Sequence, residues 1–220
     1  MLSLEGVSKH YCVGNNIIKA VDNVCLAINR NDFVMVTGRS GSGKTTLLSL
    51  IGGLTKPTSG RILLKGVDIS SLSDKDLSGA RSRTIGFIFQ FPSLIPFLRV
   101  LDNVRLPASF TQEKFADLDR AKELIRTVGL SKRSDSYPSQ LSMGEQKRVA
   151  IARALVNEPE IVLADEPTSD LDEATEKEIM QIIKEVREKS TTVVMVTHSA
   201  DLAHYGSRCF KMTAGVLREA

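Results

Sequence analysis

The chain has 220 residues, of which 42% are hydrophobic and 25% are charged, so it is long enough to bury the core of one domain with an inserted subdomain. A formal net charge of +3 is too small to indicate nucleic-acid binding by itself, and no nucleic acid is expected as a partner. Three scattered cysteines form no metal-binding or C-x-x-C pattern, which indicates reduced thiols, and no apolar run approaches the ~20 residues that span a bilayer.

The predicted strands come first in the chain and return near its end. Leu2, Leu4 and Val7 predict an edge strand that Gly6 interrupts, and short apolar runs between Asn-rich turns over 17–28 predict antiparallel hairpins. Mostly apolar runs predict further strands at 33–37, 61–64, 85–89, 161–164 and 192–197. Because several of these strands are apolar on both faces and alternate with helices, they indicate a mainly parallel sheet covered on both sides.

The character of the chain changes between Phe91 and about Ser139, where three prolines punctuate a phenylalanine-bearing loop. Helical spacing then follows over 113–128 and again from Ser142 to a stop at Glu158-Pro159, and 173–189 predicts an amphipathic helix. We read the charges of that last helix, paired as Glu173–Lys177 and Glu185–Lys189, as a solvated face. We therefore expect one domain over 1–220: an α/β core with an N-terminal antiparallel β part (1–90 and 157–220) and an inserted α-helical subdomain (91–156).

A glycine-rich segment lies between the strand at 33–37 and the helix that follows, and it reads Gly38-Arg39-Ser40-Gly41-Ser42-Gly43-Lys44-Thr45, with Thr46 next. This G-x-x-x-x-G-K-[ST] spacing is a phosphate-binding loop, in which glycine N–H groups and a helix N-terminus surround an oxyanion. Lys44 can reach the β- and γ-phosphates, and the Thr45 hydroxyl can ligate Mg²⁺. The alternative is a flexible loop with a chance lysine, which the strand before and the helix after disfavour. The sequence predicts a P-loop NTPase core that binds a nucleoside triphosphate.

Two carboxylates, Asp165 and Glu166, emerge at the end of the apolar strand at 161–164, where ligands of open α/β sheets bind. Neighbouring residues on a strand point to opposite sides, which suits two separate tasks. Asp165 would hold Mg²⁺ and Glu166 would orient or deprotonate the attacking water. His198 follows another apolar strand; such a histidine is usually structural, but beside a phosphate site it can donate to the γ-phosphate.

The segment Leu141-Ser142-Met143-Gly144-Glu145-Gln146 has two readings. Ser142 with Glu145 three residues later is a capping box, which would begin a helix in any protein. The same geometry leaves a helix N-terminus, a hydroxyl and the Gly144 N–H available to an anion. The residues alone do not decide between these readings.

Taken together, these segments resemble the nucleotide-binding subunit of an ATP-binding cassette (ABC) transporter over essentially the whole chain. GRSGSGKT is similar to the phosphate loop of that family, LSMGEQ to its LSGGQ signature, and IVLADE to its Walker B strand with the catalytic glutamate. The loop at 169–172, Gln90 and His198 stand where the family has its following loop, its lid glutamine and its switch histidine. Residues 141–146 are called the signature segment below.

The resemblance implies a role for each of these residues. Tyr11, otherwise a half-buried residue at a strand end, would stack on adenine, and Gln90, otherwise only the end of a strand, would reach the metal and the reaction centre. It also implies a head-to-tail dimer, in which Ser142 and Gly144 of one copy, with Glu145 beside them, close over ATP held by Lys44 of the other. The remaining partner would be an integral membrane permease subunit, which would place the chain on the cytoplasmic face of the cell membrane.

Three residues depart from the family pattern. Met143 replaces the first glycine of LSGGQ, Glu145 replaces its glutamine, and Asp170 stands where a small residue is frequent. Met143 would crowd the ATP sandwich, and Glu145 would repel a γ-phosphate unless it turns back to cap its own helix. We therefore expect reduced but present ATP hydrolysis.

The stretch from Phe89 to Pro107 resembles the branch of the family that serves lipoprotein release, macrolide efflux and cell division. In that family the region receives a coupling helix of the membrane subunit, and Phe91, Leu94, Ile95 and Phe97 would either form that docking surface or simply pack the subdomain. Two other functions remain open: a soluble ABC ATPase of translation or DNA repair, and an ATP-gated scaffold that barely hydrolyses ATP.

Overall fold

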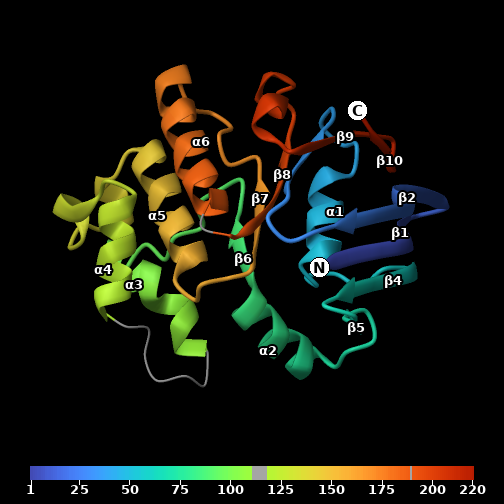
Figure 1. The fold of residues 1–220 in the computed structure, drawn as a ribbon, viewed down its shortest axis with the longest axis horizontal. Helices are drawn as coiled ribbons and strands as arrows, with labels where there is room; N and C mark the ends of the chain where they lie inside the picture. Colours follow the sequence, from blue (N-terminus) through green and yellow to red (C-terminus); the bar gives the residue numbers. More distant parts are fainter. Residues whose placement is uncertain (111–117, 189) are drawn as a thin grey trace. The chain divides into compact units, whose positions relative to one another are not determined.

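The computed structural model describes residues 1–110, 118–188 and 190–220, and Figure 1 labels their elements where there is room. The chain forms two compact units: Met1–Ser78 with Thr192–Ala220, and Gly79–Thr191. The boundary between them falls within helix α2 (Asp74–Thr84). The phosphate-binding loop thus belongs to the first unit, and the signature segment to the second. The predicted helical subdomain at 91–156 lies within the second unit, and its bounds remain a prediction.

The first unit contains a four-stranded antiparallel sheet in the spatial order β2-β1-β4-β5. Its strands are β1 (Leu2–Val13), β2 (Asn16–Ile28), β4 (Ser59–Leu64) and β5 (Val67–Asp68). Leu2 pairs with Ile28 on one side and with Leu64 on the other, so the prediction of an edge strand at the start of the chain is wrong. The expected interruption at Gly6 is present: its φ is 59°, and the register shifts between Leu4 and Val7.

Further strands of the first unit pair in the order β10-β9-β3-β8, with β10 antiparallel to β9 and the other neighbours parallel. They are β3 (Phe33–Thr37), β8 (Thr192–Thr197), β9 (Arg208–Thr213) and β10 (Val216–Glu219). Strand β3 lies between β8 and β9 and runs parallel to both, with Thr37 opposite Thr197 and Lys211. Helix α1 (Lys44–Ile51) packs on β8, and a short helix η4 (Asp201–Tyr205) contacts β3. The apolar residues of β3 and β8 are buried, as expected for strands covered on both faces.

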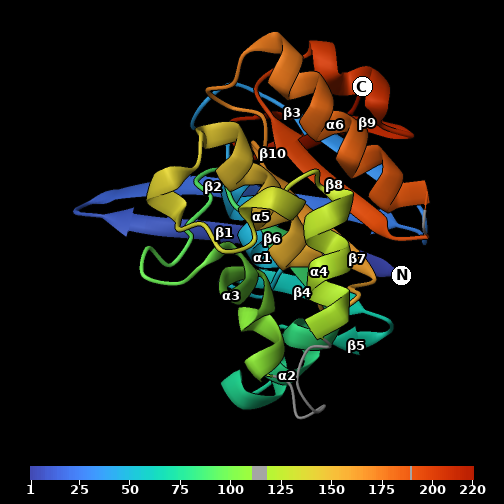
Figure 2. The same cartoon turned by 90° about the vertical axis from the view of Figure 1, so that its left-hand side faces the viewer.

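The second unit combines one parallel strand pair with most of the helices (Figures 1 and 2). Strand β6 (Ile85–Ile88) pairs with β7 (Ile161–Asp165), with Ile88 opposite Ala164. The helices are α3 (Val100–Arg105), η1 (Leu106–Phe110), α4 (Leu118–Thr127), η2 (Ser131–Arg133), η3 (Pro138–Gln140), α5 (Met143–Leu155) and α6 (Glu173–Glu188). Helix α5 contacts α3, α4, α6 and β6, so it is the central helix of this unit.

Two expected helices end differently from their predicted ranges. Helix α4 accounts for the expectation over 113–128, of which 113–117 lie outside the described residues. Helix α6 corresponds to the helix expected over 173–189. Lys189 lies outside the described residues, and so does the predicted Glu185–Lys189 pair. The Glu173–Lys177 pair is present on an exposed face, with 2.6 Å between its charged atoms. No helix of the described residues combines the length and the apolar composition that crossing a membrane requires.

Candidate functional site

The phosphate-binding loop, residues 38–43, joins β3 to α1. Gly43 is the N-cap residue of α1, with a φ of 106°. A Cβ there would collide with the carbonyl oxygen of Ala20, so only glycine fits and the backbone approaches the start of α1 closely. The first turn of α1, which is described throughout, holds no acidic side chain. The helix N-terminus is therefore suited to a negatively charged ligand.

Two side chains of the loop segment are buried. Lys44 is 5% exposed, and its Nζ donates hydrogen bonds to the carbonyl oxygens of Gly38 at 2.8 Å and Arg39 at 3.1 Å. The hydroxyl oxygen of Ser42 is buried and has no hydrogen-bond partner among the described residues. A buried polar atom in this state is costly, and a phosphate ligand could satisfy it. Arg39, Ser40, Gly41 and Thr45 are exposed, and Gly38, Gly43 and Thr46 are half-buried.

His198 leaves the parallel sheet of the first unit next to this loop. It directly follows β8, whose last residue Thr197 pairs with Thr37, and Thr37 directly precedes Gly38. The Oγ1 atom of Thr197 accepts a hydrogen bond of 3.0 Å from the Ser199 N–H, which fixes the turn after the strand. Because parallel strands end at the same edge, the structure brings the exposed His198 and the phosphate-binding loop to one edge of the sheet.

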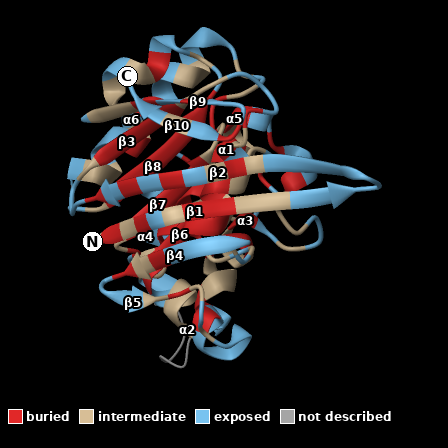
Figure 3. Ribbon diagram, turned by 90° about the vertical axis from the view of Figure 1, so that its right-hand side faces the viewer, coloured by how far each residue is buried: buried red, intermediate tan, exposed pale blue. Residues whose placement is uncertain are grey.

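Tyr11 lies near the tip of the β1–β2 hairpin, which is exposed (Figure 3). It pairs with Ile18 of β2, and the two residues are 41% and 51% exposed. Lys9 Nζ lies 5.2 Å from the centroid of the Tyr11 ring. The hairpin therefore offers a flat aromatic surface with an apolar neighbour, and such surfaces stack on planar ligands.

The predicted carboxylates of the second unit lie at the end of β7. Asp165 is the last residue of the strand, and Glu166 follows with a φ of 44°. This φ is uncommon for a residue with a side chain, and its carbonyl oxygen accepts a hydrogen bond of 3.1 Å from the Ser169 N–H. Gln90 comes two residues after β6, the parallel partner of β7. All three side chains are half-buried, and the structure brings them to one edge of the strand pair.

The signature segment forms the capping box that its spacing predicted. The Ser142 hydroxyl accepts a hydrogen bond from the Glu145 N–H at 3.2 Å, and Glu145 Oε2 accepts one from the Ser142 N–H at 2.8 Å. Arg133 Nε donates to the other oxygen of Glu145 at 3.1 Å. The Ser142 N–H, aided by Arg133, lowers the pKa of Glu145 against the opposing effect of burial. The Glu145 carboxylate is thus held on its own helix as an anion.

The two other residues of this turn differ in exposure. Gly144 is buried, and a Cβ there would lie 2.6 Å from the Cγ2 atom of Thr175 on α6. The close packing of α5 against α6 therefore favours glycine at position 144, in addition to the predicted role of Gly144 in binding ATP. Met143 is 45% exposed at the first position of α5.

Lys147, on the same helix, was not among the residues predicted from the sequence. This lysine is 4% exposed, and its Nζ donates hydrogen bonds to the carbonyl oxygen of Ser169 at 2.6 Å and to the Ser169 hydroxyl at 3.2 Å. Burial lowers the pKa of Lys147, while the carboxylates of Asp170 and Glu166 oppose that shift. The available signal was spacing, because Lys147 falls on the buried stripe of α5 between Gly144 and Ile151.

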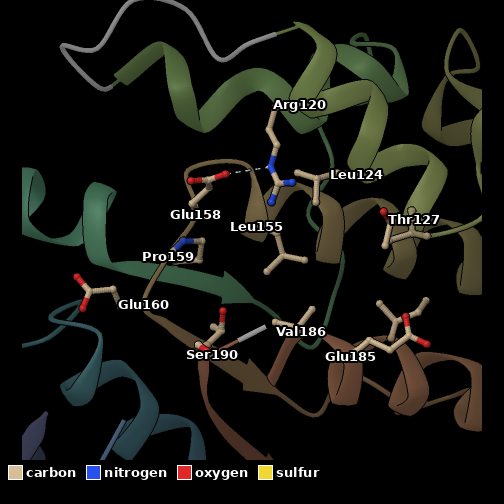
Figure 4. A pocket seen from close by; sticks show the side chains of 13 residues that line it. Arg120, Leu124, Thr127, Leu155, Glu158, Pro159, Glu160, Glu185, Val186 and Ser190 are labelled. Carbon is tan, nitrogen blue, oxygen red and sulfur yellow. Dashed lines mark ion pairs between the residues drawn. The ribbon is translucent and has the colours of Figure 1, made fainter. Parts of the chain in front are cut away.

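A cavity of about 400 Å³ lies elsewhere in the second unit, between α4, α6 and the loop before β7 (Figure 4). Arg120 and Glu158 face one another in it, with 3.6 Å between Nε and Oε1. Leu124, Leu155 and Val186 contribute apolar surface. None of the residues predicted to bind ATP or to act in catalysis lines this cavity.

Comparison with known proteins places the chain in a family. Residues 21–169 match the family model described as ABC transporter. The chain is 43% identical to the macrolide export ATP-binding/permease protein MacB of Rhodopirellula baltica, over 100% of this chain and 33% of the relative. It is 39% identical to the lipoprotein-releasing system ATP-binding protein LolD of Blochmanniella floridana, over 99% of this chain and 94% of the relative. The chain thus spans about a third of the length of the MacB relatives that it matches.

Solved structures agree with this assignment. A dimeric, post-hydrolysis state of the ATP-binding cassette MJ0796, from Methanocaldococcus jannaschii and bound to ADP and Pi, has a TM-score of 0.94 at 42% identity and covers 100% of this chain and 98% of its own. The protein cbiO1 of Clostridium perfringens, part of the ABC transporter complex cbiONQ, has a TM-score of 0.86 at 30% identity and covers 99% and 86%. The predicted α/β fold with a P-loop NTPase core is confirmed. The chain belongs to the ABC transporter family and is an ATP-binding cassette of that family.

Proposed function

We propose that the chain binds ATP with Mg²⁺, hydrolyses the ATP as a head-to-tail dimer of two copies, and so drives a membrane subunit. The observation that carries this proposal is the construction of the phosphate-binding loop. The position of Gly43 has no room for a side chain, and Lys44 Nζ donates a hydrogen bond to a carbonyl oxygen of the loop. Ser42 Oγ is buried without a hydrogen-bond partner in the described part of the chain. Such a loop stabilises a bound phosphate through N–H groups and one cation.

The predicted residues would hold the nucleotide and the metal ion. Tyr11 would stack on adenine, and residues 38–46 would hold the phosphates. Thr45, Gln90 and Asp165 would hold Mg²⁺. The described residues contain no group of three or more His, Cys, Asp or Glu side chains placed to bind a metal ion, so phosphate oxygens would complete its shell, as is usual for Mg²⁺. Bound there, Mg²⁺ would neutralise charge on the β- and γ-phosphates.

Hydrolysis would depend on Glu166, which would orient or deprotonate the attacking water. The left-handed backbone of Glu166 and the hydrogen bond from Ser169 hold this residue in a defined turn, as positioning of a water requires. His198 and Lys44 would stabilise the charge on the γ-phosphate. The structure of the relative MJ0796 with ADP and Pi supports a hydrolytic cycle for a cassette of this kind.

The dimer would complete each site with a second copy. Ser142 and Gly144 of one copy would contact ATP on the phosphate-binding loop of the other, and the dimeric state of the MJ0796 cassette supports the pairing of two copies. Glu145 is held on its own helix by Ser142 and Arg133, which would limit repulsion of a γ-phosphate. Met143 remains exposed at the helix start and would crowd the contact. We therefore expect hydrolysis that is present but reduced.

A membrane permease subunit would dock on the stretch after β6. Phe91 and Phe97 are 66% and 77% exposed, so these two side chains do not simply pack the subdomain, whereas Leu94 and Ile95 are half-buried. Large exposed apolar side chains favour a protein contact. The names of the MacB and LolD relatives favour export or lipoprotein release as the driven process. Docking would hold the chain peripherally on the cytoplasmic face of the membrane.

ATPase assays of the purified chain, with Lys44→Ala and Glu166→Gln as variants, test the enzymatic proposal. We expect Mg²⁺-dependent turnover by the wild type, loss of nucleotide binding in Lys44→Ala, and an ATP-bound dimer without turnover in Glu166→Gln, measured by light scattering. A Glu166→Gln variant that stays monomeric with ATP and Mg²⁺ would show that the sandwich dimer is wrong. Tight ATP binding by a wild type without turnover would favour the ATP-gated scaffold.

Docking has its own test. Purification from solubilised membranes should yield the wild type together with an integral membrane protein, and Phe91→Ser with Phe97→Ser should lose that protein while keeping ATPase activity. Retention of the same partner by the double variant would contradict docking at this surface. Recovery of the chain only from the soluble fraction would favour a soluble ABC ATPase.

A further inference from the structure

Lys147 connects the helix of the signature segment to the turn that follows Glu166. Its Nζ donates hydrogen bonds to the Ser169 carbonyl oxygen at 2.6 Å and hydroxyl at 3.2 Å. The Ser169 N–H in turn donates to the Glu166 carbonyl oxygen at 3.1 Å. A direct chain of contacts therefore leads from α5 to the backbone of Glu166, the predicted catalytic residue, within one compact unit.

The turn that Lys147 holds has an unfavourable backbone. Glu166 and Asp170 have φ values of 44° and 60°, in a region that residues with side chains rarely adopt. Such a conformation persists only where surrounding contacts determine it. Lys147 supplies such a contact from inside the protein, because it is 4% exposed and is hydrogen-bonded to the residue between these two.

The charge of Lys147 also matters. Burial of an ammonium group is costly unless polar and charged partners compensate it. Burial does lower the pKa of Lys147, and the carboxylates of Asp170 and Glu166 act against this effect. A neutral side chain would fill the space, but it would lose both the hydrogen bonds to Ser169 and the attraction to these two carboxylates.

We propose that Lys147 is a positioning residue for ATP hydrolysis, whose ammonium group fixes the turn of residues 166–170 and thereby the carboxylate of Glu166. This inference rests on the proposed function. Ser142 and Gly144 lie one turn earlier on the same helix, and they would contact the nucleotide of the opposite copy. Lys147 therefore links the segment that would contact ATP of the opposite copy to Glu166, which would act on ATP bound to its own copy.

Lys147→Met tests the role in catalysis, because methionine keeps most of the length and removes the charge. We expect kcat to fall about tenfold or more, since small displacements of a catalytic group have effects of this size, while KM for ATP stays within about twofold. The matched control is Lys184→Met, at an exposed position of α6, which should leave both constants unchanged. The thermal unfolding temperature of Lys147→Met should fall by no more than about 2–4 °C, because removing the desolvation cost of a buried ammonium group partly offsets the lost hydrogen bonds to Ser169.

A double-variant cycle separates positioning from packing. If Lys147 acts through the 166–170 turn, Asp170→Asn alone should lower kcat, and kcat of Lys147→Met with Asp170→Asn should be close to that of Lys147→Met alone. Independent, multiplicative effects of the two substitutions, or an unchanged kcat in Lys147→Met, would overturn the proposal.

Hydrogen exchange of the nucleotide-free protein decides the matter without turnover. The Ser169 amide should exchange at least about tenfold faster in Lys147→Met than in the wild type or in Lys184→Met, because the contact that holds the turn is lost. Unchanged exchange would overturn the role of Lys147 even if the wild type hydrolyses ATP. A wild type that binds ATP without hydrolysing it would instead refute the proposed function by itself.

Discussion

Ser142 and Glu145 satisfy each other at the start of α5: the Glu145 carboxylate accepts from the Ser142 N–H at 2.8 Å, and the Ser142 hydroxyl accepts from the Glu145 N–H at 3.2 Å. These two hydrogen bonds hold the Glu145 side chain at the start of its own helix. Its negative charge therefore does not point away from the helix. Glu145 therefore departs from the LSGGQ pattern in sequence while its carboxylate is used locally. The Ser142 hydroxyl has a structural role here, and its proposed contact with ATP can be tested separately.

Substitutions of Ser142 separate capping from nucleotide contact. Ser142→Ala should lower the free energy of unfolding by about 1 kcal/mol, because the Glu145 N–H loses its acceptor, and the unfolding temperature by about 2–4 °C. Ser142→Asp should retain near wild-type stability, because aspartate caps a helix as well as serine does and its negative charge interacts favourably with the helix N-terminus. Thermal unfolding of the three proteins measures this.

The same two variants, made in a Glu166→Gln background, test the dimer. The added charge of Ser142→Asp should abolish ATP-dependent dimerisation in light scattering, although its fold is as stable as that of the parent. A Ser142→Asp protein that dimerises like its parent would show that Ser142 only caps its own helix.

The Glu145 carboxylate should make stability depend on pH. Its pKa in the folded protein lies below the ordinary value of 4.5, so its contribution is fully present above the unfolded pKa and is lost as the pH falls through the folded pKa. At pH 7, Glu145→Gln should be less stable than the wild type by about 0.5–1 kcal/mol, since the amide keeps an acceptor for the Ser142 N–H but loses the charge that faces Arg133. The difference should shrink below about pH 4.5 and vanish below the folded pKa. Urea unfolding of both proteins from about pH 3 to 7 measures it; a constant difference would contradict this role.

Local patterns in the sequence predicted most of the fold and the local structure around the candidate site. The phosphate-binding loop, the strand before Asp165 and the Ser142–Glu145 capping box each depend on neighbouring residues, and all three are present. Features that need a distant partner were not predictable in this way. Strand β1 seemed an edge strand because nothing within it reveals that β4 pairs with its second side.

Lys147 illustrates the same limit within the site. A lysine among the charged residues of α5 is ordinarily solvated, and its burial depends on Ser169, which follows in the turn after another strand. The left-handed backbone of Glu166 could not be predicted either, because the residue type that usually indicates this conformation in a sequence is glycine. The places of these residues in the fold were thus predictable, and the contacts that hold them were not.

The approach of Gly144 to Thr175 gives a test of helix packing in the second unit. Gly144→Ala should lower the free energy of unfolding by about 1–3 kcal/mol, because the new Cβ would lie 2.6 Å from Thr175 Cγ2 and the helices must shift. Thr175→Ser removes that methyl group and keeps the hydroxyl, which donates to Asp172 Oδ2 at 2.8 Å. The double variant should therefore recover most of the loss in urea unfolding. Purely additive effects of the two substitutions would show that Gly144 is not limited by this contact.

Met143 provides the test of whether the altered signature segment limits turnover. It is 45% exposed at the first position of α5, where the family has a glycine, so Met143→Gly would remove bulk from the proposed contact with ATP. We expect ATP turnover equal to or higher than that of the wild type, together with an unfolding temperature lower by about 2–4 °C, because glycine destabilises a helix by about 1 kcal/mol. Met143→Leu is the matched control, since it keeps the bulk and should keep wild-type turnover. Lower turnover in Met143→Gly with normal turnover in Met143→Leu would show that an apolar side chain supports the contact at this position, and that the proposed crowding is wrong.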